Sequence, residues 1–115
     1  MAKDHRAFIA HALDCAQAIA EFTRDGRESF LQDRKTRDAV LRNLEVLGRC
    51  IKDADLAALL QDAPDVPWTK VAAFRNILAH EYLGVDPQLV WAIIENHLPA
   101  LESALVSHLN RLSRQ

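Results

Sequence analysis

The chain has 115 residues, of which half are hydrophobic, 26% are charged and three are glycine. This size and composition predict one helical domain over residues 1–115 and argue against a disordered chain or a β-sandwich. The net charge of −2 argues against broad, non-specific coating of nucleic acid.

No apolar run approaches the length of a membrane span, and the first residues lack the apolar core of a signal peptide. We therefore expect a cytoplasmic protein without membrane contact. Cys15 and Cys50 each lie in an apolar helical pattern and do not form a Cys-x-x-Cys pair. They are predicted to be reduced, packed thiols.

Apolar residues at helical spacing predict a first helix that is capped by Asp4 and ends at about Phe22 or Thr23. The Asp-Gly pair that ends at Gly26 should close this helix. Residues 29–31 are expected to form a short connector before the next helix.

A second long helix is predicted up to about Lys52, followed by a short helical piece over residues 55–61. Two prolines within residues 64–67 should then turn the chain. The second helix buries one apolar stripe, which consists of Val40, Leu44, Leu47 and Ile51.

The next helix is predicted over about residues 68–82, and the last begins at Asp86 as N-cap with Pro87 in the first helical position. Pro99 predicts a kink or brief break near His97. No strand alternation appears. Four principal helices joined by short connections predict an all-α, antiparallel four-helix bundle with one short extra helix.

The segment 75–82, Arg-Asn-Ile-Leu-Ala-His-Glu-Tyr, concentrates polar chemistry on one helix. At about 100° per residue, Arg75 and Tyr82 fall within roughly 20° of each other, and Asn76 and His80 follow on the same broad arc. The helix thus presents a cation, a titratable base and a hydroxyl on one side. The neighbouring apolar stripe consists of Val71, Phe74 and Leu78.

This segment resembles the Arg-x4-His-x-Tyr signature of the HEPN superfamily, and most closely its HepT-like branch, the toxin half of HEPN/MNT toxin–antitoxin pairs. The resemblance extends from about residue 33 to 105 and is specific between residues 68 and 91. Arg49 stands where that branch carries an acidic residue. The flanking residues that also agree are Asn43-Leu44-Glu45, Gly48, Pro67-Trp68, Gly84-Val85-Asp86, Val90-Trp91 and Leu98-Pro99.

The resemblance implies a two-fold homodimer whose motif helices face one another across a cleft, and an endoribonuclease that cleaves an RNA substrate there. RNA supplies its own 2′-hydroxyl nucleophile, so the reaction needs an acid–base group and a cation but neither a metal nor a cofactor. His80 can carry out the proton transfers, because the pKa of histidine normally lies near neutrality. Arg75 can stabilise the phosphorane, because its guanidinium stays charged and bonds phosphate oxygens. These two are the predicted catalytic residues. Asn76 either positions the substrate or is a plain surface amide.

Tyr82 has two interpretations. As a structural residue it is a tyrosine at a rim or interface, with its ring packed and its hydroxyl in water. The resemblance implies instead that a cognate MNT-type nucleotidyltransferase antitoxin attaches adenylate to it. A bulky anion there would occupy the cleft and pair with Arg75.

Two other classes of function remain open. One is a non-catalytic HEPN module that binds RNA or a nucleotide, or that holds a nucleotidyltransferase; the other is a structural helical adaptor. The first half of the chain carries more basic than acidic residues. The basic residues are either solvated side chains of a loop and a helix start, or they form a surface that steers RNA. They are Arg24, Arg27, Arg34, Lys35 and Arg37. The remaining histidines are expected at the surface or the edge of the core rather than as metal ligands, and they are His5, His11, His97 and His108.

Overall fold

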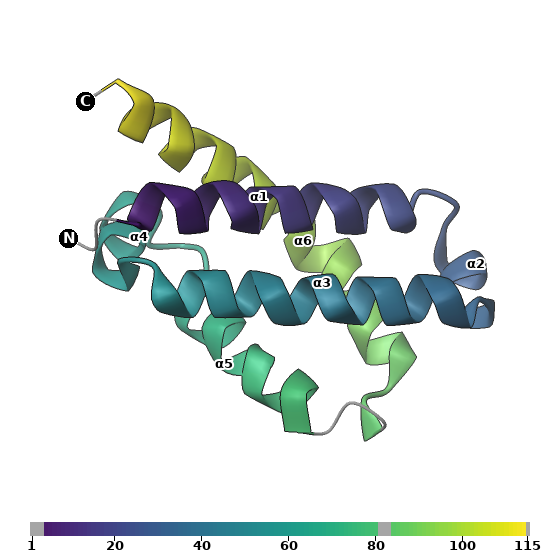
Figure 1. Cartoon of the computed structure of the whole chain (residues 1–115). Coiled ribbons are helices and arrows are strands. Elements are labelled where there is room, and N and C mark those ends of the chain that lie inside the picture. Colours follow the sequence, from purple (N-terminus) through teal and green to yellow (C-terminus); the bar gives the residue numbers. More distant parts are fainter. Residues whose placement is uncertain (1–3, 81–83, 115) are drawn as a thin grey trace.

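Six α-helices make up the residues that the computed structural model describes, 4–80 and 84–114, and no strand occurs among them. α1 and α3 lie side by side along the molecule, α5 packs on α3, and α6 crosses behind and packs on α1 (Figure 1). The predicted all-α bundle is confirmed. Its helices are α1 (His5–Phe22), α2 (Arg27–Gln32), α3 (Arg34–Asp53), α4 (Leu56–Asp62), α5 (Trp68–His80) and α6 (Pro87–Ser113).

Aspartates start several of these helices. The side chains of Asp33, Asp55 and Asp86 each accept a hydrogen bond from a backbone N–H of the following first turn, at 3.2, 3.2 and 2.9 Å. Each cap satisfies a donor that the helix itself leaves unpaired. The predicted start of α6, with Pro87 at its first position, is confirmed. Asp4 precedes α1 as predicted, but its side chain makes no capping hydrogen bond.

The connector expected over residues 29–31 is wrong, because this segment belongs to helix α2. Gly26 turns the chain with a φ of 95°, a conformation that favours glycine, and α2 begins at the next residue. Phe30 is buried and lies against Trp91 of α6, with ring centroids 5.6 Å apart. This apolar contact holds the short helix on the bundle.

Helix α6 continues through Pro99, so of the two expected alternatives, a kink or a brief break near His97, the break is wrong. Proline removes the N–H that would bond the carbonyl of Glu95. Both residues lie on the exposed side of α6, where water can bond that carbonyl. The opposite side stays packed on either side of the proline, through Ile94, Leu98, Leu101 and Leu105.

The core lies mainly between α1 and α3 and is closed by α6. Cys15 and Cys50 are buried in it, which confirms the prediction of packed thiols. Burial, with a smaller contribution from the neighbouring Cys50, raises the pKa of the Cys15 thiol to about 11. The buried stripe predicted for the second helix is also confirmed, since Val40, Leu44, Leu47 and Ile51 are all buried on α3.

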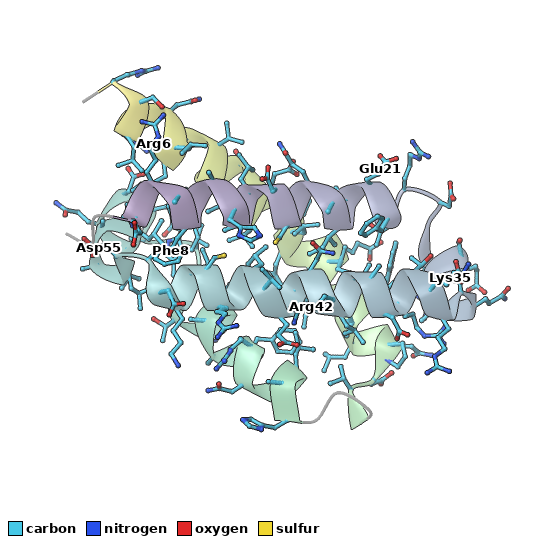
Figure 2. All side chains as sticks on the ribbon, in the orientation of Figure 1. Arg6, Phe8, Glu21, Lys35, Arg42 and Asp55 are labelled. Carbon is cyan, nitrogen blue, oxygen red and sulfur yellow. The ribbon has the colours of Figure 1, made fainter. Side chains whose placement is uncertain are left out.

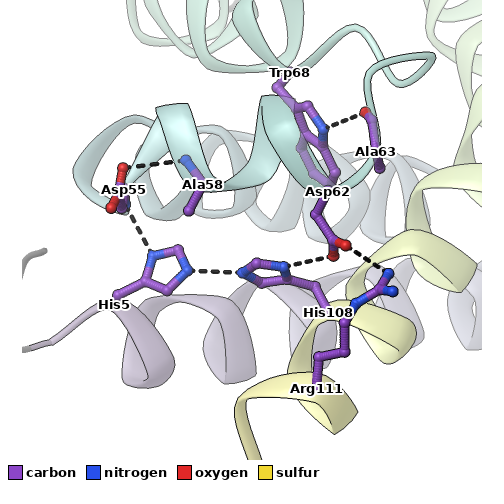
Figure 3. A network of polar contacts seen from close by, with 8 residues as sticks. All are labelled: His5, Asp55, Ala58, Asp62, Ala63, Trp68, His108 and Arg111. Carbon is purple, nitrogen blue, oxygen red and sulfur yellow. Dashed lines mark hydrogen bonds and ion pairs between the residues drawn. The ribbon is translucent and has the colours of Figure 1, made fainter. Parts of the chain in front are cut away.

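Two histidines from opposite ends of the sequence meet inside the bundle, His5 on α1 and His108 on α6 (Figure 3). Their Nε2 atoms are 2.8 Å apart, and both residues are buried. The expectation of a surface or core-edge position was wrong for this pair, because each ring has a partner on α4 or at its start. The backbone N–H of Asp55 donates to His5 Nδ1 at 2.9 Å, and His108 Nδ1 lies 2.8 Å from Asp62.

These contacts define where the ring protons sit. A backbone N–H can only donate, so His5 Nδ1 is an acceptor and the ring proton of His5 is on Nε2. His5 Nε2–H therefore donates to His108 Nε2, and His108 Nδ1–H donates to the Asp62 carboxylate. Both rings are neutral in this arrangement. Arg111 completes it with an ion pair to the other Asp62 oxygen at 2.6 Å.

Candidate active site on helix α5

The helix that carries the motif is anchored at both described ends. Trp68 is fully buried, and its indole Nε1 donates to the carbonyl of Ala63 at 3.0 Å. Leu78 is buried near the other end, while Val71 and Phe74 are half-buried against the core. The predicted apolar stripe is confirmed, and it fixes which side of α5 faces outward.

Arg75 lies half-buried between the anchored side and the exposed side of α5. Its Nη1 donates to the side-chain oxygen of Asn76 at 3.0 Å. Its Nε is buried and has no hydrogen-bond partner within the part of the chain described. A buried donor without a partner is uncommon in folded proteins. The inner edge of this guanidinium is therefore enclosed, while its Nη1 is bonded to Asn76.

The polar residues that were predicted to share one arc of α5 differ in their exposure to solvent. Asn76 and His80 are exposed, and Ile77 between them is 46% exposed although it is apolar. The structure thus joins Asn76 to Arg75 and places His80 in the last described turn of α5. Tyr82 and its predicted modification lie outside the described residues.

An apolar groove of about 460 Å³ opens beside α5, between it, α3 and α6. It adjoins the anchored side of α5, because Val71 and Phe74 line it whereas Arg75 and His80 do not. Asp65, Lys70 and His97 supply the polar groups of its lining. The groove is consequently distinct from the surface that carries the motif.

The predicted basic surface gathers around α2 and the start of α3, where Figure 2 labels Lys35. Several of its arginines face a neighbouring carboxylate. Arg34 lies 3.5 Å from Asp38, and Arg27 lies 3.3 Å from Glu28. These pairs are exposed, so each contributes little to stability, but together they reduce the positive charge available to an RNA strand.

Two classes of feature are missing from residues 4–80 and 84–114. No three histidine, cysteine, aspartate or glutamate side chains there gather in a way that could hold a metal ion. None of the helices there combines the length and the apolar character that crossing a membrane requires.

Comparison with known proteins then identifies the family. Residues 12–107 match the ribonuclease HepT-like family. This chain belongs to that family. The match spans α3, α5 and most of α6 together with the motif, so the HEPN resemblance drawn from residues 75–82 is confirmed.

Several archaeal relatives support the assignment. A protein of Methanocaldococcus jannaschii named as a candidate RNase is 38% identical over 98 residues, which cover 84% of this chain and 80% of the relative. A protein of Thermococcus cleftensis named a probable ribonuclease HepT is 34% identical, over 89% of this chain and 93% of the relative. No solved structure matches the chain.

A further relative is longer. This protein of Methanocaldococcus jannaschii is named both a gamma-glutamylcyclotransferase and a candidate RNase. It is 30% identical over 99% of this chain, which spans only 51% of the relative.

Two features, one at the site and one elsewhere in the bundle, escaped prediction to different degrees. Gly48 was noted only as part of a pattern, yet it lies buried on α3 directly beneath Arg75. A glycine inside a strongly predicted helix was the available signal. The His5–His108 pair had no sequence signal, since the two residues are 103 positions apart.

Proposed function

We propose that this protein is a metal-independent endoribonuclease whose catalytic groups are Arg75 and His80 on α5, with Asn76 positioning the substrate. Family membership supports the reaction class. The observation that carries the assignment to these residues is local: an enclosed guanidinium, bonded to Asn76, lies little more than one helical turn from an exposed imidazole. Such a pair suits a phosphodiester that approaches from solvent.

The proposed reaction is an internal transesterification. His80 removes the proton of the RNA 2′-hydroxyl, and the oxygen attacks the adjacent phosphorus. The bond from phosphorus to the 5′-oxygen breaks, a second imidazole protonates that oxygen, and a 2′,3′-cyclic phosphate remains. Arg75 stabilises the charge that develops on the phosphorane oxygens, because a guanidinium stays charged and bonds two oxygens at once.

A second copy of the chain would supply the second imidazole. The exposed Ile77 lies between Asn76 and His80 and gives α5 an apolar contact point at the centre of the motif surface. A two-fold contact there would place both copies of His80 at one cleft. Ile77→Glu should then yield a monomer by sedimentation and abolish cleavage. Leu60→Glu is the matched control, because Leu60 is 40% exposed on α4; an Ile77→Glu protein that remains dimeric and active would contradict the proposed contact.

Cleavage itself is tested with total RNA in the presence of EDTA. His80→Ala and Arg75→Ala should each lower the rate by about 10²-fold or more, with 2′,3′-cyclic phosphate ends in the wild-type products. The matched controls are His11→Ala and Arg6→Ala, which alter exposed residues of α1 that lie outside the predicted basic surface. A folded His80→Ala or Arg75→Ala protein that cleaves at the wild-type rate would refute the mechanism. RNA binding without cleavage by the wild type would favour the non-catalytic HEPN module instead.

We further propose that this protein is the toxin of a toxin–antitoxin pair with an MNT-type nucleotidyltransferase. That partner would transfer adenylate from ATP to the Tyr82 hydroxyl and release pyrophosphate, and the bulky anion would block the cleft. Co-expression with the partner should add the mass of one or more adenylates to the peptide that contains Tyr82. Tyr82→Phe should remain active beside the partner, and complete silencing of this variant would show inhibition by binding alone.

A further inference from the structure

Gly48 lies in the middle of a long helix, where glycine is less favourable than alanine because it loses more backbone freedom on folding. α3 runs without interruption from Arg34 to Asp53, so no turn accounts for the residue. Gly48 is also buried, and its backbone does not adopt a positive φ. Its presence therefore calls for a reason in the packing around it.

The helix α5 supplies that reason. A Cβ at position 48 would lie 2.8 Å from the Cβ of Arg75 and 3.0 Å from the carbonyl oxygen of Val71. Ordinary carbon–carbon contacts begin at about 3.5 Å, so α5 would have to retreat by roughly 0.7 Å. Neither contact involves the far end of a flexible side chain. A change of rotamer cannot relieve them, and the backbone of α5 itself must move.

We infer that Gly48 is a positioning residue for Arg75, and this inference rests on the proposed function of Arg75 as the group that binds phosphate. The missing side chain lets α5 settle on α3 at the depth where Arg75 Nε is enclosed. Enclosure of Nε and the bond from Nη1 to Asn76 orient the guanidinium before any substrate arrives. A positioned catalytic group loses about 10²-fold in rate when it is displaced by about 1 Å.

A purely structural glycine would behave differently from a positioning one. If Gly48 served only the packing of α3 against α5, alanine would change the folded fraction but not the behaviour of each folded molecule. If it acts through Arg75, its effect must disappear once the guanidinium is gone. A double-mutant cycle between positions 48 and 75 distinguishes the two.

The cycle compares wild type, Gly48→Ala, Arg75→Ala and the double variant. Binding is measured by fluorescence anisotropy on a fluorescein-labelled, fully 2′-O-methylated single-stranded RNA, and cleavage is measured on total RNA, both per folded molecule. Gly48→Ala should lower cleavage by about 10- to 100-fold and weaken binding, with no further loss of binding in the Arg75→Ala background. The matched control is Gly84→Ala, where an added Cβ meets nothing within 4 Å. Losses that add in the double variant, or a wild-type rate in Gly48→Ala, would overturn the inference.

A second measurement does not depend on activity or on the stability of a variant. In protein labelled with ¹⁵N-arginine, the Hε proton of Arg75 should exchange slowly with water in the wild type, because Nε is enclosed. Its signal should shift and exchange faster in Gly48→Ala but not in Gly84→Ala. Rapid exchange in the wild type, or an unchanged signal in Gly48→Ala, would overturn the inference. If the wild type fails to cleave RNA, the proposed function fails, and this spectrum alone decides whether Gly48 positions Arg75.

Discussion

Mild acid should lower the free energy of unfolding of this protein, because it protonates the buried His5–His108 pair. Burial lowers the pKa of His5 below 6.5, and the neighbouring His108 lowers it further, against an opposing effect of Asp55. The geometry agrees: protonation of His5 Nδ1 would set two donors against each other at the Asp55 N–H. Folding is thus coupled to keeping this ring neutral.

The direction and size of the effect follow from proton linkage. The unfolded chain binds a proton at His5 near pH 6.5, whereas the folded chain binds it only at lower pH. The free energy of unfolding therefore has its full value above pH 6.5 and declines below it, by at most about 1.4 kcal/mol at about pH 5.5. Burial raises the pKa of Asp62, but the hydrogen bond from His108 and the charge of Arg111 outweigh this and hold it below 3.8. Asp62 therefore contributes a constant amount in this range.

Urea unfolding followed by far-ultraviolet circular dichroism measures the effect, at about pH 7.5, 6.5 and 5.5. Protein concentration must be fixed because a dimer would make stability depend on it. His5→Leu should be less stable by about 1–3 kcal/mol at the highest pH, since the Asp55 N–H and His108 Nε2 lose their partner. It should also lose less stability on acidification than the wild type.

The control for this experiment is His11→Leu, because His11 lies exposed on the same helix. This variant should retain the acid sensitivity of the wild type. A free energy of unfolding of the wild type that does not change across this pH range would contradict the role of His5. So would an equal decrease of this free energy in the wild type and in His5→Leu.

Trp68→Ala should lower the free energy of unfolding by about 3–5 kcal/mol, because it empties a fully buried position at the start of α5; a loss below about 1 kcal/mol in urea would contradict this packing. Asp86→Ala should cost about 1 kcal/mol through the lost cap of α6, and an unchanged urea midpoint would show that the cap is not needed. The Cys15 thiol, buried and with a pKa raised to about 11, should resist Ellman's reagent in the native protein and react after unfolding, whereas rapid native reaction would show that its site opens.

The helices were predictable because their signals are local. Asp86 and Pro87 lie at consecutive positions, and the cap they predict forms over two residues. The burial of Leu78 likewise follows from the spacing of apolar residues along one helix, as predicted for the stripe that it shares with Val71 and Phe74. The helix around Phe30 was missed because Phe30 packs against Trp91, a partner 61 positions away in the chain, and no local pattern shows this contact.

For the candidate site, too, some features follow from neighbouring residues and others from the packing of helices. The sequence by itself determined that Arg75, Asn76 and His80 share one helix and that this chain carries a HepT-like motif, since helical spacing and a motif are properties of neighbouring residues. Only the tertiary structure decided that Arg75 is held against α3 over Gly48 while His80 stays exposed. Depth of burial and the distance between two helices arise from packing, which brings together residues that no local pattern connects.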